Sequence, residues 1–454
     1  MSKIAKLQTK DIKKLVDLCE KTATFSVEEY KNNQVMRGLR DEFGTGVIAG
    51  LTDISDVIAK KVVNGVKEPC AGELYYRSIN VKDMIAGYDE EMHSGFEEVV
   101  YLLLFNKLPT KKELIEFKRM LADLRKLPKN FVRDVIMKAP TKDIMNALAK
   151  SILNLSSYDV NPDETSIENV LNQCLLLIAI SPLFAVYAYN AHMHYNENKS
   201  LVIHKPVPEL STAENVLHML RPDSKYTALE AKVLDIAFML HAEHGGGNNS
   251  TFTTHVVTSS GTDTYSTMTA ALCSLKGPRH GGANIKVMEM FADLKKHVKD
   301  WKDEKQIEEY LSNLLDGKAF DKKGLIYGVG HAVYSISDPR AEVFKGFVQD
   351  LATEKHRSNE FKLYAKVEEI AKRLIMERRK IFKGVSANVD FYSGFVYNML
   401  GLPIELYTPM FAIARMAGWS AHRLEEIINN GKIIRPAYVS TNTRKPYTKI
   451  NDRK

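Results

Sequence analysis

The chain has 454 residues, 44% hydrophobic and 26% charged, which is typical of a soluble globular protein with room for two or three domains. Its formal charge of +7 comes from 63 basic and 56 acidic residues. This excess is too slight and too widely spread to indicate a nucleic-acid-binding protein, although it favours an anionic substrate. The four cysteines are far apart and include no C-x-x-C pair, which argues against a zinc ribbon and predicts reduced thiols in the cytoplasm.

The chain shows no sign of a targeting or membrane segment. Its N-terminal stretch, MSKIAKLQTKDIKKLVDLCEK, lacks an apolar core and arginine and contains acidic residues, so we expect neither a secretory signal nor a mitochondrial presequence. The longest apolar run, Cys174–Tyr189, contains Pro182 and is too short to cross a membrane. We expect it to form a buried core helix.

Helical periodicity dominates the chain. The first clear signals are Glu97–Leu104 and then residues 108–127, where Thr110 and Glu113 form a capping box. Strand-like alternation is confined to Glu73–Ile79 and Leu201–Lys205, so the pattern predicts an all-α fold. Further helices with the same spacing are expected at Ile167–Ala191, Thr212–Leu220, Thr227–His241, Thr267–Leu275, Ile285–Leu294, Gln306–Leu315, Val367–Lys380 and Pro409–Asn429.

The charge pattern suggests two helical domains. Residues 295–323 and 354–383 are richly charged and lie between glycine-rich segments. We therefore predict a small mobile domain, 283–398, inserted into a larger one made of 1–282 and 399–454. The polar end, Thr441–Lys454, is expected to be an arm.

The first chemical motif is HAEHGGGN. His241 and His244 are three apart and share a helix face, but the spacing is not the H-E-x-x-H of zinc proteases. Taken alone, the pair is more typical of helix-end histidines that cap carbonyls and pack. The glycines at 245–247 favour a site instead, because they let the backbone approach a ligand closely.

The second motif is GPRHGGAN. Gly277-Pro278 ends a helix, and Gly281-Gly282 begin another just after His280. The dipole of the following helix disfavours an imidazolium, so we expect a neutral ring that can donate to a developing enolate oxygen. The alternative is a solvent-facing turn histidine.

The third motif is YGVGHAVYSISDPR. Gly328 and Gly330 bracket a turn that presents backbone groups and His331. A lone G-x-G is weak evidence and is not a dinucleotide fingerprint. Arg340 follows Pro339 at an expected helix start, where an arginine can face a carboxylate.

The remaining motifs lie near the C-terminus. Asp390 has apolar and aromatic neighbours, which would raise its pKa toward that of a useful base, although alone it is more typical of an N-cap. Arg415 lies on an apolar helix face, where a guanidinium requires an anionic partner. Arg435 precedes Pro436 after a turn at Gly431.

Together, the glycine-framed histidines, the aspartate and the arginines favour proton abstraction next to a carbonyl, on or near a dianionic substrate. HAEHGGGN, GPRHGGAN, GVGHAVYSISDPR, NVDFYSG and FAIAR…RP occur in the same order and at closely similar spacing as in citrate synthases. FEEVVYLLLFNKLPTKKEL also resembles that family, so the resemblance runs from about Gly72 to Arg435.

The resemblance implies a homodimeric enzyme that condenses acetyl-CoA with oxaloacetate, with no metal or cofactor beyond its substrates. It implies that Asp390 removes the methyl proton, His280 stabilises the enol and His331 donates to the oxaloacetate carbonyl. The expected oxaloacetate ligands are His244, Arg340, Arg415 and, from the partner subunit, Arg435.

The family pattern also bears on CoA. Val329 and Gly330 resemble the loop that recognises the adenine, and Lys383 matches a phosphate contact. Ser335 stands where relatives often have a basic residue, and Ser386-Ala387 replace an expected Tyr-Pro. These departures put the CoA contacts in doubt.

Two alternatives stay open at this point. A 2-methylcitrate synthase uses propionyl-CoA and shares every catalytic position, and one methylene is worth only about 1–3 kcal/mol of discrimination. A catalytically inactive helical scaffold or regulator is the alternative from another class.

Overall fold

The computed structural model describes residues 9–22, 24–41, 45–330, 333–381 and 384–453. His331 and Lys383 therefore lie outside the described residues. The chain forms two compact units, Gly50–Ile434 and the combination of Met1–Ala49 with Arg435–Lys454.

The smaller unit contains short helices and extended chain. Its helices are α1 (Thr9–Thr22), α2 (Val27–Asn32), η1 (Arg37–Leu39) and η5 (Ile450–Asp452). A capping box starts α2, since Ser26 and Glu29 each accept a hydrogen bond from the other's backbone N–H. Residues 431–449 have no regular structure, and nearly all of them are exposed, as expected of an arm.

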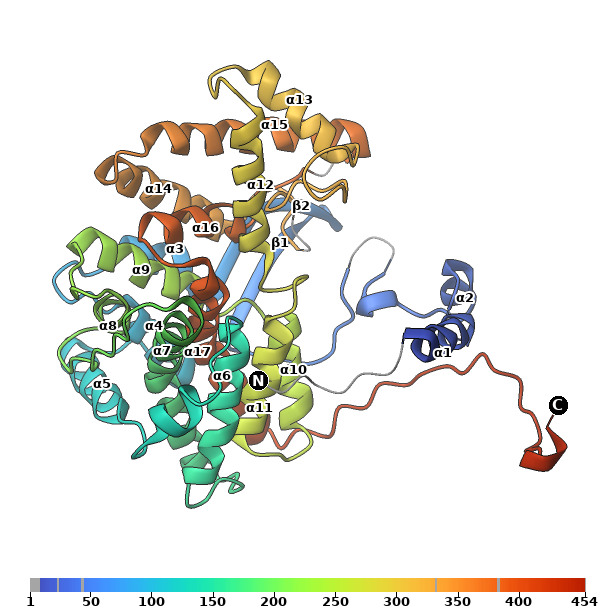
Figure 1. Ribbon diagram of the computed structural model, residues 1–454, viewed down its shortest axis with the longest axis horizontal. Helices are drawn as coiled ribbons and strands as arrows, with labels where there is room; N and C mark the ends of the chain where they lie inside the picture. Colours follow the sequence, from blue (N-terminus) through green and yellow to red (C-terminus); the bar gives the residue numbers. More distant parts are fainter. Residues whose placement is uncertain (1–8, 23, 42–44, 331–332, 382–383, 454) are drawn as a thin grey trace. The chain divides into compact units, whose positions relative to one another are not determined.

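The larger unit is mostly helical (Figure 1). The Thr110–Glu113 capping box starts a helix at Lys111, as predicted. Its helices are α3 (Val81–Ala86), α4 (Gly95–Phe105), α5 (Lys111–Leu124), η2 (Val132–Ile136), α6 (Ile144–Leu155), η3 (Ser156–Tyr158), α7 (Ile167–Glu197), α8 (Thr212–Leu220), α9 (Ala228–His241), α10 (Asn249–Thr258), α11 (Thr264–Leu275), α12 (Ala283–His297), α13 (Glu304–Leu315), α14 (Pro339–Glu354), α15 (Ser358–Arg379), α16 (Val389–Met399), η4 (Ile404–Leu406) and α17 (Tyr407–Ile428).

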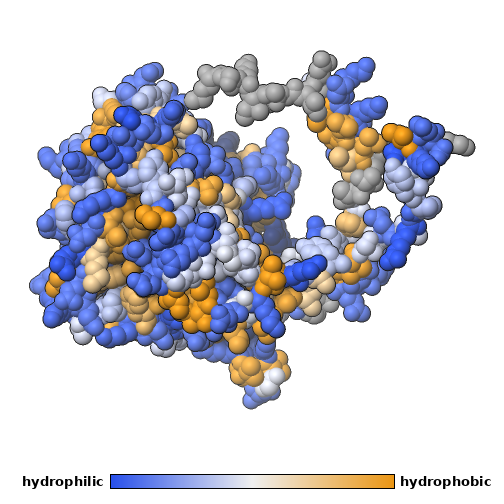
Figure 2. Space-filling model, turned by 90° about the horizontal axis from the view of Figure 1, so that it is seen from below, coloured by the Kyte–Doolittle hydropathy of each residue, from blue (hydrophilic) through white to orange (hydrophobic). Residues whose placement is uncertain are grey.

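The core forms around α7 and α17, which pack against each other. By length and composition α7 could cross a membrane, but 78% of its most apolar stretch is buried within the protein. The predicted core helix is thus confirmed, and it extends beyond the apolar run at both ends. On the face shown in Figure 2, hydrophilic residues predominate and hydrophobic ones form scattered groups.

A small sheet qualifies the all-α prediction. β1 (Ser55–Val63) and β2 (Val66–Tyr76) form an antiparallel hairpin, and β3 (Ile79–Asn80) pairs with the end of β2. Asn64 and Gly65 both have positive φ, as the tight two-residue turn requires. The expected strand at Glu73–Ile79 overlaps β2 and β3, whereas Leu201–Lys205 forms no strand.

Helices α12 to α16 lie together on one side of this unit (Figure 1). α16 packs against α12 and α14, and α15 packs against α13 and α14. This group is connected to the central helices by contacts of α12 with α17 and of α14 with α9. The predicted domain boundary at 283–398 stays a prediction.

Candidate active site

The helix that carries Asp390 is tied to the glycine turn before His331. Val329 and Ala387 form an isolated antiparallel bridge. The Gly330 N–H donates to the Ser386 carbonyl (2.7 Å), and the Asn388 N–H donates to the Gly328 carbonyl (2.9 Å). The turn and the start of α16 therefore form one backbone-bonded element.

Two glycines make this turn possible. Gly328 has φ +80° and Gly330 has φ +104°, conformations that a side chain disfavours. A Cβ at Gly328 would also lie 2.8 Å from the side chain of Val287 and 2.9 Å from that of Phe391. The turn packs tightly against α12 and α16.

Asn388, not Asp390, caps α16. Its side chain accepts a hydrogen bond from the Asp390 N–H (3.0 Å), and its amide donates to the Gly330 carbonyl (2.9 Å). The N-cap alternative for Asp390 is therefore wrong. The Asp390 carboxylate does not cap the helix, so it can take part in other interactions.

The environment of Asp390 disfavours the charged form of its carboxyl. Burial raises its pKa to about 7, and the nearby charge of Asp338 adds to this effect, while Arg340 and Arg415 oppose it. The residue keeps some accessible surface. A carboxyl of this kind is near the optimum for a general base at neutral pH.

His280 is held by a serine at the start of α10. Its Nε2 lies 3.0 Å from Ser250 Oγ, which also accepts a hydrogen bond from Trp419 Nε1 (3.2 Å). The single Ser250 proton can go to His280 Nε2 or to Asn248 Oδ1, 3.0 Å away. When it goes to the histidine, a neutral ring carries its own hydrogen on Nδ1 and can donate there.

The neutrality of His280 has a different cause from the one expected. Burial and, to a smaller extent, the positive charge of Arg415 together lower its pKa to about 4. The following helix begins only at Ala283, with Gly282 at its N-cap, so the ring is not at the helix terminus itself. The prediction of a neutral imidazole agrees with this environment.

Arg340 is positioned by its own helix cap. Pro339 occupies the first turn of α14, and Asp338 caps the helix by accepting from the Arg340 N–H (3.0 Å). The same carboxylate binds the guanidinium through two hydrogen bonds, Nε to Oδ1 (3.0 Å) and Nη2 to Oδ2 (2.7 Å). This bidentate pair fixes the plane of the arginine.

Arg415 is fully buried on α17, and only one of its guanidinium nitrogens makes a hydrogen bond to a described residue. Its Nε donates to the His241 carbonyl (2.7 Å). Among the residues that the structure describes, Nη1 and Nη2 have no hydrogen-bond partner. Burial lowers its pKa to about 10 although the charge of Glu243 opposes the shift, so the guanidinium remains a cation. The two terminal nitrogens suit a bound carboxylate.

The two histidines of the first motif contribute differently. His241 is buried beside the rings of Phe344 and Phe411, and burial, then Arg340 and Arg415, hold its pKa well below the usual range. His244 is buried against Tyr334, with ring centroids 5.5 Å apart in a T-shaped arrangement. His241 thus packs, as the simpler interpretation predicted, and supplies the carbonyl that holds Arg415.

The chain is similar to proteins of one known family. A family model described as "Citrate synthase, C-terminal domain" matches residues 42–437. The chain belongs to the citrate synthase family. Among its curated relatives, a 2-methylcitrate synthase of Shewanella oneidensis is 32% identical over 378 residues, 82% of this chain and 90% of that protein. A citrate synthase of Deinococcus radiodurans is 35% identical over 363 residues, 79% and 89% of the two chains.

Solved structures show the same fold. Citrate synthase from Thermotoga maritima has a TM-score of 0.70 at 30% identity, over 90% of this chain and 98% of that one. The Thermoplasma acidophilum citrate synthase, in a ternary complex with carboxymethyl coenzyme A and oxaloacetate, has a TM-score of 0.73 at 27% identity. That match covers 92% of this chain and 99% of the other.

Within this citrate synthase fold, the larger unit brings several predicted site residues together. The charge of Arg415 acts on both His280 and Asp390, and that of Arg340 acts on Asp390. Val329 and Gly330 form the turn bonded to Asp390's helix. Arg435 begins the C-terminal segment of the other unit, so its role across a dimer interface stays a prediction.

Sequence reasoning missed the residues that support this site. Ser250 holds His280, Asn388 caps α16 and Asp338 fixes Arg340. The two caps carry a recognisable signal, since Asn and Asp directly before a helix are preferred N-cap residues. Ser250 carries no such signal, because its partner is 30 residues away.

Proposed function

We propose that this chain is a citrate synthase that condenses acetyl-CoA with oxaloacetate and water to give citrate and CoA. The observation that carries the proposal is the proximity of Asp390, with a pKa of about 7, to the buried Arg415 and its two terminal nitrogens without partners among the described residues. A base near neutrality and a cation suited to a carboxylate are what this condensation requires.

The first step forms the enol of acetyl-CoA. Asp390 takes a proton from the thioester methyl group, a weak acid that must be activated at its oxygen at the same time. His280 donates from Nδ1 to that oxygen, and Ser250 holds the opposite ring nitrogen. Because the imidazole is neutral, it donates without first losing a proton.

The second step forms the carbon–carbon bond. The enol carbon attacks the ketone carbon of oxaloacetate, the ketone oxygen takes a proton from His331, and the enol hydrogen returns to His280 as the thioester carbonyl re-forms. The carboxylates of oxaloacetate are held by Arg340, Arg415, His244 and Arg435 of the partner subunit, which fixes the ketone in line for the attack. Water then cleaves the thioester of citryl-CoA, releasing citrate and the CoA thiol.

The assembly proposed around this chemistry is a homodimer with a closing domain. Movement of 283–398 over the site would exclude water until the carbon–carbon bond is made, which protects the thioester. Val329 and Gly330 would receive the adenine of CoA, and Lys383 would contact a phosphate. The presence of carboxymethyl coenzyme A and oxaloacetate in a solved relative supports this substrate pair.

A second candidate is 2-methylcitrate synthase, which uses propionyl-CoA. Relatives with each name match this chain at similar identity, 32% and 35%. Both reactions need the same base and the same oxaloacetate ligands. Comparing kcat/KM for acetyl-CoA and propionyl-CoA distinguishes them, and a preference for propionyl-CoA would replace the first proposal with the second.

The direct test measures oxaloacetate-dependent release of free thiol from acetyl-CoA. We expect ready turnover in the wild type and a loss of at least about 10²-fold in Asp390→Ala, because removal of a general base costs that much. Asp350→Ala, an exposed site on α14, is the control. Unchanged turnover in Asp390→Ala would contradict the role of Asp390, and an inactive wild type would favour the scaffold alternative.

A further inference from the structure

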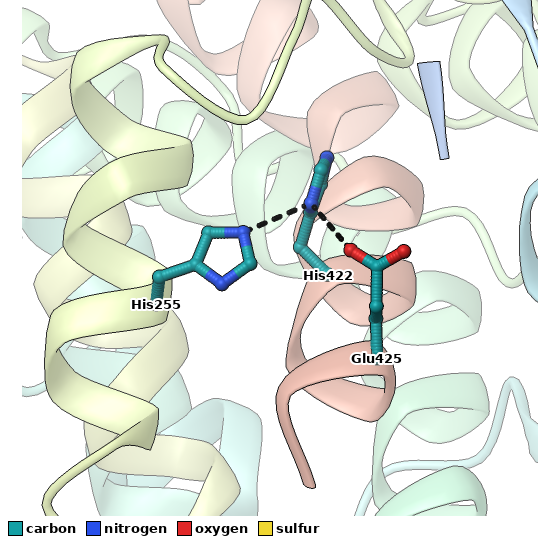
Figure 3. Close-up of side chains that lie close together, drawn as sticks. All are labelled: His255, His422 and Glu425. Atoms are coloured by element: carbon teal, nitrogen blue, oxygen red, sulfur yellow. Dashed lines mark hydrogen bonds and ion pairs between the residues drawn. The ribbon is translucent and has the colours of Figure 1, made fainter. Parts of the chain in front are cut away.

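A cluster of two histidines and a glutamate lies between α10 and α17 (Figure 3). His255 comes from α10, while His422 and Glu425 lie one turn apart on α17. His255 Nε2 and His422 Nδ1 are 3.0 Å apart, and Glu425 Oε2 is 3.7 Å from the latter. The three atoms all lie within 4.8 Å of one another.

Each histidine has a carboxylate at its other ring nitrogen. His255 Nδ1 is hydrogen-bonded to Glu426 Oε2 at 2.7 Å, and His422 Nε2 lies 3.1 Å from Glu243 Oε1 in a fully buried ion pair. When those outer nitrogens carry the hydrogens, the two nitrogens that face each other both have free lone pairs. Histidine ligands of metal ions are almost always arranged in this way.

The third group is also directed to the common point. Glu425 Oε1 accepts a hydrogen bond from the Asp53 N–H (2.8 Å), which fixes the carboxylate. Its Oε2 is buried and pairs with His422 Nδ1 at 3.7 Å, too far for a hydrogen bond. A carboxylate oxygen beside two imidazole nitrogens is a ligand set that a divalent transition metal can use.

The dimensions suit a tetrahedral ion. Two imidazole nitrogens bound to Zn²⁺ at 2.0–2.1 Å are about 3.3 Å apart in tetrahedral geometry. The observed 3.0 Å between the nitrogens needs a small opening, and the carboxylate oxygen, 3.7 Å from His422 Nδ1 and within 4.8 Å of His255 Nε2, has to move toward them. The side chains of His255 and Glu425 are 13% and 14% exposed, so an ion can enter from their side and water can fill the fourth position.

We propose that His255, His422 and Glu425 form a binding site for Zn²⁺ or a similar divalent transition metal. The proton held between the two histidines leaves to solvent, and the ion takes its place. The site joins α10, which carries Ser250, to α17, which carries Arg415. The family resemblance implied no metal beyond the substrates, and this proposal departs from that expectation. His255 and His422 are 167 residues apart, so no motif joins them.

Calorimetric titration of the chelator-treated, full-length protein with ZnCl₂ tests the proposal. We expect one saturable site per chain, and Co²⁺ in its place should give the visible absorption of a four-coordinate ion. His255→Gln should weaken Zn²⁺ binding by more than about 10-fold, and Glu426→Gln by about 10–100-fold as loss of an outer partner. His297→Gln is the matched control, since His297 also lies near a carboxylate, Asp293 at 3.6 Å, but outside the cluster.

Circular dichroism establishes that each variant is folded. Absence of saturable binding in the wild type would overturn the proposal and leave the cluster as a hydrogen-bonded network. Equal Zn²⁺ affinity in the wild type and a folded His255→Gln would overturn it as well, because the ion would then bind elsewhere.

Discussion

Replacement of Asp390 by asparagine should stabilise the protein at neutral pH while removing the base. The folded state raises the pKa of this carboxyl to about 7, chiefly by burial. Between about pH 4 and pH 7 the folded protein keeps the proton and the unfolded chain releases it. Unfolding therefore releases a proton in this window, and the stability of the wild type falls as the pH rises.

The size of the effect follows from the shift. About three pKa units at about 1.4 kcal/mol each amount to about 4 kcal/mol, and the accessible surface that Asp390 keeps lowers this to about 2–4 kcal/mol. Asparagine does not titrate, so Asp390→Asn avoids this cost. For a chain of 454 residues the unfolding entropy is about 1 kcal/mol per degree. The Tm of Asp390→Asn minus that of the wild type should therefore grow by about 2–4 °C between about pH 4 and pH 7.

Differential scanning calorimetry of both proteins from pH 4.5 to pH 8 measures this difference. We expect it to grow in favour of the asparagine variant as the pH rises. Asp350→Asn, on the exposed side of α14, controls for the loss of one negative charge. A difference in Tm that stays constant across this range would refute the argument that burial opposes the ionisation of Asp390.

Four further substitutions address other parts of the protein. Arg415→Met should raise the KM for oxaloacetate by at least about 10²-fold, with stability within about 1 kcal/mol of wild type, because two of its nitrogens have no partner among the described residues. Gly418→Ala should destabilise the protein by about 1–3 kcal/mol, since the new Cβ would lie 2.2 Å from Glu243 Oε2. In Gly346→Ala the new Cβ meets no atom within 4 Å, so we expect the free energy of unfolding to rise by about 0.5–1 kcal/mol. Chemical denaturation measures both changes. Ser250→Ala should lower kcat about 10-fold with little change in the KM for oxaloacetate, because we propose that the histidine it orients acts on the other substrate.

Local signals predicted local structure well. The capping box at Thr110 and the proline before Arg340 both mark helix starts that the structure confirms. The hairpin was missed because its strands do not alternate cleanly, although Asn64-Gly65 is a recognised hairpin turn. Asp390 resembled a cap because two residues compatible with capping lie close together, and Asn388 takes that place.

The support around the site could not be predicted in the same way, because it depends on contacts between distant parts of the chain. Ser250 contacts His280, which lies 30 residues later in the chain, and Arg415 donates to the carbonyl of His241, which lies 174 residues earlier. No spacing rule encodes such pairs. Resemblance to a family supplied the order of the predicted catalytic residues, whereas the causes of the pKa shifts of His280 and Asp390 required the folded environment.

The bridge between Val329 and Ala387 bears on how this region can evolve. Its hydrogen bonds use the carbonyl of residue 386 and the N–H of residue 388, but neither the side chain nor the N–H of residue 387. A proline or an alanine at 387 is compatible with the same bonds. Position 387 can therefore change without loss of these bonds, whereas at 386 the buried Ser386 hydroxyl also donates to the Tyr334 carbonyl (3.2 Å).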